Sequence, residues 1–109
     1  MTAYISISFS KRKFLDKELI AISSTLNEHK IKPFIFVDSY KFESAQEQQM
    51  MQQAMTDIDN CDILIAEVSD KAIGIGIEVG YAKAKHKPII YLRKKEAEHS
   101  TTISGISDF

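Results

Sequence analysis

One glutamate, Glu78, stands in the most unusual stretch of the sequence, the glycine-spaced run AIGIGIEVGYA over residues 72–82. The spacing of Gly74, Gly76 and Gly80 is longer than the dinucleotide-binding fingerprint allows. Gly74 and Gly76 instead indicate an irregular turn that lets a ligand approach the backbone closely. A carboxylate beside such a turn can act as a nucleophile toward the anomeric carbon of a sugar. Glu78 is therefore the first candidate catalytic residue.

A helix is expected from about Gly76 to His86, which would place Glu78 in its first turn. The dipole at the N-terminus of a helix favours an acid by roughly 0.3–1 kcal/mol, so Glu78 could also be a simple helix-start acid. The same field would keep the carboxylate ionised, as a nucleophile requires. The residues alone leave both interpretations open.

The elements that would position Glu78 alternate between strands and helices. Short apolar or alternating runs predict strands, and apolar residues at spacings of three and four predict helices. This order is typical of a parallel sheet with right-handed crossovers. We expect an α/β fold, a flavodoxin- or Rossmann-like parallel sheet of four or five strands flanked by helices. The expected strands are Tyr4–Phe9, Lys32–Asp38, Asp62–Val68 and Pro88–Leu92, and the expected helices are Phe14–Lys30, Ser44–Asn60 (with Ser44 and Glu47 as a capping box) and Gly76–His86, before a weakly patterned tail from Glu96 to Phe109.

The candidate ligand site follows from this topology. In an open parallel sheet, ligands bind beyond the carboxyl ends of the strands. The loop after the first expected strand contains Ser8 and Ser10, and the loop after the third leads into the helix of Glu78. These side chains are expected to face the same edge of the sheet.

The composition narrows the class of protein. The chain has 109 residues and a net charge of −1, which indicates one small domain and does not favour nucleic acid or an anionic membrane as a partner. No transmembrane run or signal peptide is apparent. The single cysteine, Cys61, cannot form an internal disulfide, so a cytoplasmic location is expected. The histidines His29, His86 and His99 lie far apart, and no metal site is expected.

The run CDILIAEVSDKAIGIGIEVGYAKAKHKPIIYL over residues 61–92 resembles the nucleoside 2-deoxyribosyltransferase family, which includes deoxynucleoside 5′-monophosphate N-glycosidases. The resemblance implies an enzyme that cleaves the bond between a nucleobase and C1′ of a deoxyribose or ribose. It implies Glu78 as the nucleophile of a glycosyl-enzyme intermediate, with Tyr4 positioning it and no metal or organic cofactor. The substrate would be a nucleoside or its 5′-monophosphate.

The same resemblance implies further binding residues. The loop after the first strand would line the sugar and phosphate, and the glycine-spaced run would contribute to substrate binding. Ser100, in the tail segment HSTTISG, would reach the 5′-phosphate in the neighbouring subunit of a homodimer. The implied substrate-binding residues are Ile7, Ser8, Phe9, Ser10, Ala72, Gly74, Gly76 and Ser100.

The sequence departs from the family pattern at several positions. Ala54 stands where family members carry an aspartate that helps protonate the leaving base, and Asp57, one helical turn on, could replace it or be a solvated surface acid. Ala72 stands where the N-glycosidases have a phosphate-binding serine, and Ile7 where members often have glycine. Family members also add a strand and a helix after the Ser100 loop. We therefore expect a single domain over residues 1–109 without those two elements.

Two other functions remain open on the sequence alone. Ala54 and Ala72 would suit a nucleotide-binding module without catalysis. The opening run from Tyr4 to Asp38 looks like the strand-helix-strand start of a TIR domain, some of which use a glutamate to split NAD. Cleavage of NAD by the purified protein would favour this last alternative.

Overall fold

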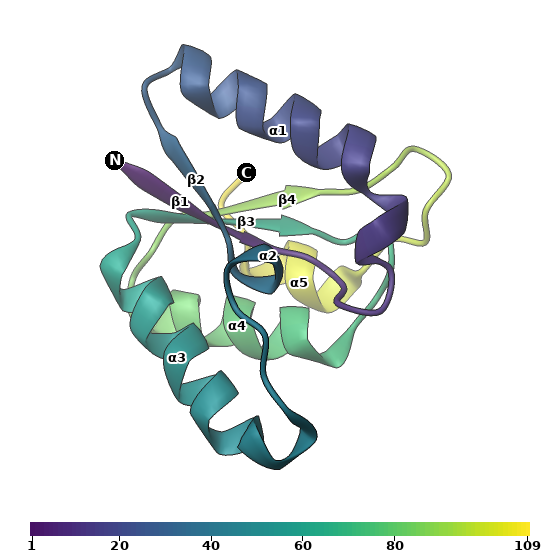
Figure 1. Cartoon of the computed structure of the whole chain (residues 1–109). Coiled ribbons are helices and arrows are strands. Elements are labelled where there is room, and N and C mark those ends of the chain that lie inside the picture. The colour runs from purple at the N-terminus through teal and green to yellow at the C-terminus, as the bar shows by residue number, and fades with distance from the viewer.

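The computed structural model describes residues 1–109, and it confirms the α/β class (Figure 1). Four parallel strands form one sheet in the order β2-β1-β3-β4. The chain first adds β2 on one side of β1 and then crosses to add β3 on the other. Such a reversal leaves a crevice at the carboxyl ends of β1 and β3. The strands are β1 (Thr2–Ser6), β2 (Lys32–Ile35), β3 (Ile63–Glu67) and β4 (Ile89–Leu92).

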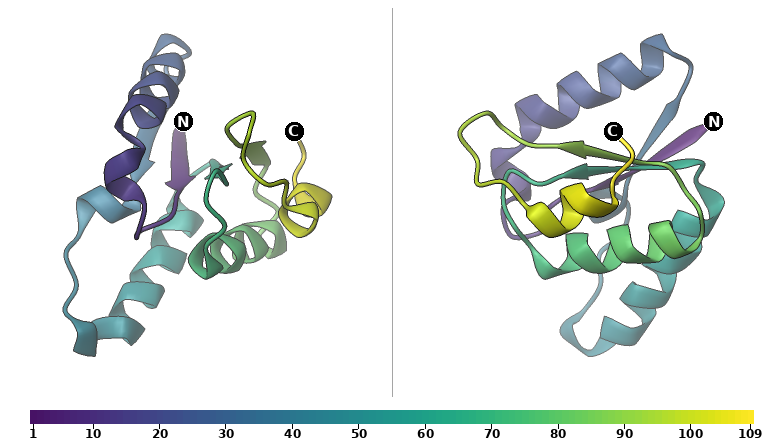
Figure 2. Two further views of the ribbon diagram at one scale, coloured as in Figure 1. Left: turned by 90° about the vertical axis from the view of Figure 1, so that its right-hand side faces the viewer. Right: turned by 180° about the vertical axis from the view of Figure 1, so that it is seen from behind.

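Helices cover both faces of the sheet (Figures 1 and 2). Helix α1 (Asp16–Glu28) lies on one face, where Leu19 and Leu26 enter a core cluster with Ile5. Helices α3, α4 and α5 lie on the other, and their apolar residues join a second cluster around Tyr4. The remaining elements are the 3-10 turns Arg12–Phe14 and Ser44–Gln46, the short helix α2 (Phe36–Ser39), α3 (Glu47–Asn60), α4 (Ile73–Ala84) and α5 (Thr101–Ile106).

Helix α4 begins earlier than the sequence predicted, at Ile73 instead of Gly76. Gly74 and Gly76 therefore lie inside the helix, no glycine has a positive φ, and the predicted irregular turn is wrong. Burial of Ile75, Val79 and Ala82 along one side of α4 explains this, because apolar burial outweighs the helix cost of glycine of about 1 kcal/mol.

Other expected boundaries also differ from those of the structure. The first strand ends at Ser6 and the second at Ile35, where the chain turns into α2. The capping box is formed by Glu43 and Gln46, not by Ser44 and Glu47, because a 3-10 turn precedes α3.

The tail contains a helix that the sequence did not predict, α5, which packs on α4 and β4. The last residues run beside the edge strand, where the N–H groups of Asp108 and Phe109 donate to the carbonyl of Ile89. Cys61 is buried, as free cysteines usually are, and burial followed by the nearby carboxylates of Asp57 and Asp62 raises its pKa to about 11. No helix has the length and apolar character needed to span a membrane.

Candidate active site

Two hydroxyls on β1 hold the carboxylate of Glu78. Side chains alternate along a strand, so Tyr4 and Ser6 both point toward the face that α4 covers. The Ser6 hydroxyl donates to Glu78 Oε1 over 2.6 Å, and the Tyr4 hydroxyl donates to Glu78 Oε2. Each carboxylate oxygen keeps a lone pair for a further contact. The three residues, called the Glu78 clamp below, lie at the crevice between β1 and β3.

Burial, not a helix dipole, dominates the electrostatics of this clamp. Glu78 lies in the second turn of α4, away from the N-terminal N–H groups that would favour its charge. Burial raises the pKa of Glu78, and the hydrogen bonds from Ser6 and Tyr4 oppose that shift. Burial, and then the charge of Glu78, raises the pKa of Tyr4, so the phenol stays protonated and remains a donor. The expectation that the helix N-terminus keeps Glu78 ionised is therefore wrong.

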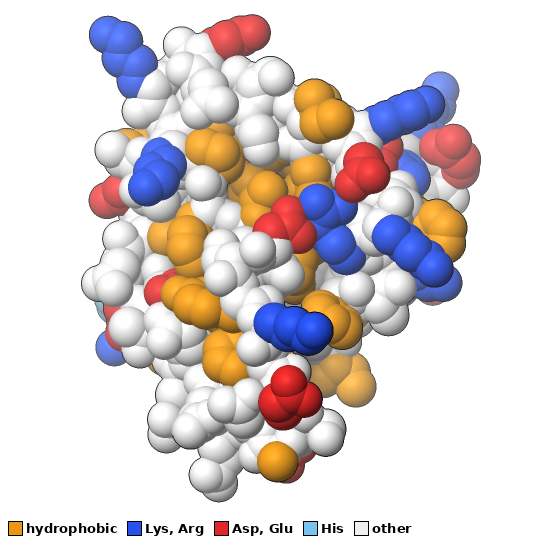
Figure 3. All heavy atoms as spheres, in the orientation of Figure 1, with side chains coloured by type: hydrophobic (Ala, Val, Ile, Leu, Met, Phe, Trp, Pro, Cys, Tyr) orange, Lys and Arg blue, Asp and Glu red, His pale blue; other side chains and the backbone are white.

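A largely apolar cavity of about 560 Å³ opens onto Glu78. Figure 3 shows apolar side chains gathered in the middle of the face that Figure 1 shows, between α1 and α3. A cavity of this size and character suits a small planar ligand. Its apolar lining consists of Ile7, Phe9, Phe36, Val37, Tyr40, Phe42, Met50, Met51 and Ala54. A smaller hollow beside Lys83 and His86 lies at the opposite edge of the sheet and does not contact the clamp.

Aromatic rings form one wall of the cavity. Phe36 and Phe42 are stacked with their ring centroids 6.1 Å apart, and Tyr40 lies 5.2 Å from Phe36 and 5.6 Å from Phe42. Phe36 also lies 6.1 Å from the ring of Tyr4, so the wall continues into the clamp. Aromatic faces bind flat conjugated rings by stacking.

Asp57 is buried on α3 and is not a solvated surface acid. It is 9% exposed, its Oδ1 accepts from Gln53 over 3.0 Å, and its Oδ2 has no hydrogen-bond partner. Burial, and then the neighbouring carboxylate of Asp57, raises the pKa of Tyr40, which lines the cavity. Asp57 is also close enough to raise the pKa of Tyr4. Asp57 is therefore near both Tyr4 of the clamp and Tyr40 of the aromatic wall.

Of the other candidate substrate-binding residues, only residues of the loop after β1 lie at the cavity. Ile7 and Phe9 line the cavity, and Ser8 is buried beside Ser10. Ala72, Gly74 and Gly76 lie at the start of α4 and do not line the cavity.

Ser100 is engaged at the start of α5 and makes no hydrogen bond with the clamp. Its hydroxyl caps α5 by accepting from the N–H of Ile103, and its own N–H donates to the hydroxyl of Tyr91. The side chain is buried, and it does not line the cavity. In this chain Ser100 therefore acts as a helix cap.

Sequence reasoning missed three polar residues. Ser6 was overlooked although its spacing from Tyr4 would have placed it on the same face of β1. Tyr40 could have been suspected from the concentration of aromatic residues over residues 34–42. No local signal marks Asp70, whose Oδ2 accepts from the Ser8 hydroxyl, because only folding brings the two loops together.

Known proteins resemble this chain in sequence and in fold. The sequence profile of the family described as nucleoside 2-deoxyribosyltransferase matches residues 9–107. A protein of Syntrophotalea carbinolica named putative 2′-deoxynucleoside 5′-phosphate N-hydrolase 1 is 36% identical over 81 residues, which are 73% of this chain and 54% of that protein. The chain thus spans about half the length of this relative.

Solved structures show the same fold at low sequence identity. A 2-deoxyribosyltransferase from Bacillus psychrosaccharolyticus superposes with a TM-score of 0.74 at 14% identity, over 98% of this chain and 82% of that one. A 2-deoxyribosyltransferase from Leishmania mexicana gives 0.67 at 18% identity, over 84% and 63%. A CMP N-glycosidase from Clostridium botulinum gives 0.65 at 20% identity, over 99% and 84%.

Proposed function

The chain belongs to the nucleoside 2-deoxyribosyltransferase family, and on that premise we propose that it cleaves the N-glycosidic bond of nucleosides or nucleotides through a glycosyl-enzyme intermediate on Glu78. The observation that carries this proposal is the Glu78 clamp at the mouth of an aromatic-walled cavity. The nucleobase stacks against the wall, and C1′ of the sugar faces the carboxylate. Tyr4 and Ser6 hold that carboxylate in one orientation for attack.

In the first step, a Glu78 oxygen attacks C1′ and the bond from C1′ to the base nitrogen breaks. The bonding electron pair goes to the base, which leaves far more readily if it gains a proton at the same time. General acid catalysis of this kind typically raises the rate of the step by about 10²- to 10⁴-fold. The products of the step are a glycosyl ester on Glu78 and a free base.

Asp57 supplies that proton through the hydroxyl of Tyr40. Ala54, at the family's aspartate position, presents only a methyl group to the cavity. Asp57 is buried one turn further along α3, and it is close enough to the cavity residue Tyr40 to raise the pKa of its phenol. The Tyr40 proton passes to the base as the Asp57 proton replaces it. The unpartnered Oδ2 of Asp57 is consistent with this role, because an unpaired buried polar atom lowers stability and a catalytic use would explain why it is kept.

In the second step, water or a second base attacks C1′ of the ester and the Glu78 carboxylate leaves. The attacking group loses a proton, which returns to Asp57 along the same path. Attack by water gives hydrolysis, and attack by a base gives transfer. The proposed steps use only the side chains named above, the substrate, and water or a second base.

The alternative functions are not favoured. The family match covers residues 9–107, which include the run around Glu78. The TIR-like resemblance covers only the opening run from Tyr4 to Asp38. A binding module without catalysis would not need two hydroxyls that donate to one half-buried carboxylate.

The proposed enzyme is a cytoplasmic homodimer in which Ser100 approaches the 5′ end of the substrate in the neighbouring subunit. Ile73 and Ile77 leave an exposed apolar strip on α4, and Ile73 is 85% exposed. Equal mixing of Glu78→Ala and Ser100→Gly proteins tests the shared site, because glycine is nearly as good an N-cap as serine. Recovered activity in the mixture is expected, and a mixture no better than its components contradicts a shared site.

The activity itself is tested by incubating the protein with the common deoxynucleosides and their 5′-monophosphates, with and without a second base. Base release that depends on Glu78 is expected. Mass spectrometry of rapidly quenched protein should show one added sugar on wild-type protein and none on Glu78→Ala. No release above the level of Glu78→Ala would contradict the proposed function.

A further inference from the structure

Two segments that are distant in sequence both line the cavity. The loop after β1 contributes Ile7 and Phe9, and most of the aromatic wall comes from residues 36–42, called the wall segment below. The wall segment has little regular structure, because α2 is four residues long and residues 40–43 belong to no helix or strand. None of its residues is buried. Such a segment depends on side-chain contacts to keep its place.

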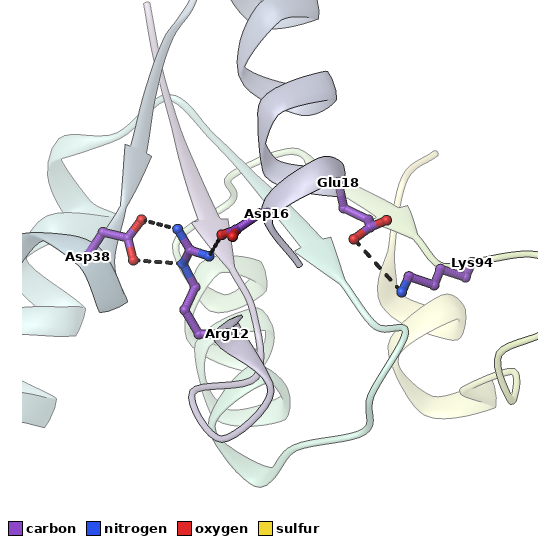
Figure 4. A network of polar contacts seen from close by, with 5 residues as sticks. All are labelled: Arg12, Asp16, Glu18, Asp38 and Lys94. Atoms are coloured by element: carbon purple, nitrogen blue, oxygen red, sulfur yellow. Dashed lines mark hydrogen bonds and ion pairs between the residues drawn. The ribbon is translucent and has the colours of Figure 1, made fainter. Parts of the chain in front are cut away.

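Arg12 joins these two segments (Figure 4). Its backbone N–H donates to the carbonyl of Phe9 over 3.3 Å, so Arg12 is tied to a residue of the cavity lining. Its guanidinium donates from Nε and Nη2 to the two oxygens of Asp38, over 2.7 and 2.8 Å. Asp38 lies on α2 beside Val37, which lines the cavity. Paired bonds of this kind fix the relative orientation of arginine and carboxylate.

A third bond ties Arg12 to a helix outside the site. Its Nη1 donates over 2.7 Å to Asp16, the first residue of α1, and Asp16 does not line the cavity. The side chain of Asp16 is 70% exposed and that of Asp38 is 40% exposed, so water and salt weaken the pair with Asp16 more. The pair with Asp38 is therefore the better protected of the two.

One guanidinium thus serves two carboxylates. Without its charge, Asp16 and Asp38 would repel each other. Helix α1 is held by Leu19 and Leu26 in the core, whereas the wall segment has no buried residue. The repulsion would therefore displace the wall segment and not α1.

We propose that Arg12 and Asp38 are positioning residues, which hold the wall segment against the loop after β1 and so keep the stacking surface for the flat ring of the ligand in place. They act through the aromatic wall and do not touch the ligand. The effect on turnover rests on the proposed function, whereas the effect on the wall segment does not. Because Glu78 is held from β1 and α4, loss of the Arg12–Asp38 pair weakens binding and leaves the chemical step nearly unchanged.

The kinetic test compares Asp38→Asn with Asp16→Asn, which removes the other ion pair of the same arginine. With 2′-deoxyadenosine and thymidine, Asp38→Asn should raise KM by about fivefold with kcat nearly unchanged, and Asp16→Asn should change KM by less than about twofold. Both nucleosides are uncharged, so salt acts on the protein alone. Added sodium chloride should raise KM of wild-type protein toward that of Asp38→Asn, whose own KM should hardly change.

A double variant tests the role of charge. Arg12→Gln should raise KM by about tenfold or more, because the two carboxylates are left without their cation. Adding Asp38→Asn to Arg12→Gln should lower KM again, to the level of Asp38→Asn alone. A surface ion pair with no positioning role would change KM in none of these proteins, and that result overturns the proposal.

Nuclear magnetic resonance tests the wall segment in the free protein, without turnover. Relaxation dispersion of backbone amides should show microsecond-to-millisecond exchange over residues 36–42 in Asp38→Asn, and none there in wild type or Asp16→Asn. A wall segment that is equally ordered in all three proteins overturns the inference and leaves the proposed function intact. Exchange confined to Asp38→Asn, with no base release by wild type, supports the positioning role while the proposed function fails.

Discussion

Helices α3 and α4 pack side by side on one face of the sheet, and each carries one acid of interest, the buried Asp57 on α3 and the half-buried Glu78 on α4. On α4, both oxygens of Glu78 are held by hydroxyls of β1. On α3, Asp57 accepts one hydrogen bond from Gln53 and has one oxygen without a partner. A nucleophile needs one fixed orientation, whereas a group that moves protons must exchange partners during the reaction. The two environments thus suit the two different roles.

The strongest test of this difference is Asp57→Asn, which keeps the shape of the side chain but removes the proton donor. Base release should fall by about 10²- to 10⁴-fold. A 4-nitrophenyl deoxyriboside, whose leaving group needs no proton, should lose far less, and rates for both substrates can be followed by absorbance. Asp59→Asn changes an exposed acid on the same helix and should leave both rates nearly unchanged. Equal losses for both substrates in Asp57→Asn would contradict a role in protonation.

A companion change moves the acid back toward the family position. Adding Ala54→Asp to Asp57→Asn places a carboxylate directly in the cavity lining. Part of the lost activity should return, by about tenfold or more, because a donor again reaches the base. The extra buried charge should lower the melting temperature, which circular dichroism would show. A double variant as inactive as Asp57→Asn would indicate that the base does not lie near Ala54.

The second prediction concerns the clamp on α4. Tyr4→Phe keeps the packed ring but removes a donor to Glu78, so kcat should fall by up to about a hundredfold through loss of orientation. The Tyr4 hydrogen bond opposes the raised pKa of Glu78. Without it the pKa rises further, and the acidic limb of the rate profile should move to higher pH. A fall in kcat with an unmoved limb would show that Tyr4 does not act through Glu78.

The sequence predicted the position of Glu78 better than the burial of Asp57. Glu78 sits in a motif with local spacing, and the topology of the sheet follows from the order of apolar runs. Asp57 looked like a solvated acid because its burial depends on the packing of α3 against β1 and α4, which no local pattern encodes. The start of α4 was missed for a related reason. Glycine is a poor helix former on its own, and only contact of Ile75 and Val79 with the sheet extends the helix through Gly74 and Gly76.

The third prediction tests whether the orientation of Glu78 costs stability. Its raised pKa means that the folded chain binds more protons than the unfolded chain between the ordinary glutamate pKa, near 4.3, and the raised value. Stability therefore falls as pH rises through that window. Glu78→Gln should melt a few degrees higher than wild type at neutral pH, and the gain should vanish below about pH 4. Thermal melts from pH 3.5 to 8 measure this, and a variant less stable than wild type at neutral pH would contradict it.

The smallest expected effect comes from the glycines, which α4 has and α3 lacks. A Cβ added to Gly80 would meet no atom of this chain within 4 Å. Gly80→Ala should therefore stabilise the monomer by about 1 kcal/mol, and Gln52→Gly at an exposed position of α3 should destabilise it by a similar amount. Denaturant titration at low protein concentration measures both. If a second subunit packs closely on α4, Gly80→Ala should also weaken dimerisation in sedimentation equilibrium, because the new methyl group would occupy the contact. If the monomer is stabilised and dimerisation is unchanged, Gly80 is not needed for close approach of a second subunit. If the monomer is destabilised, the prediction that a methyl group fits at Gly80 is wrong.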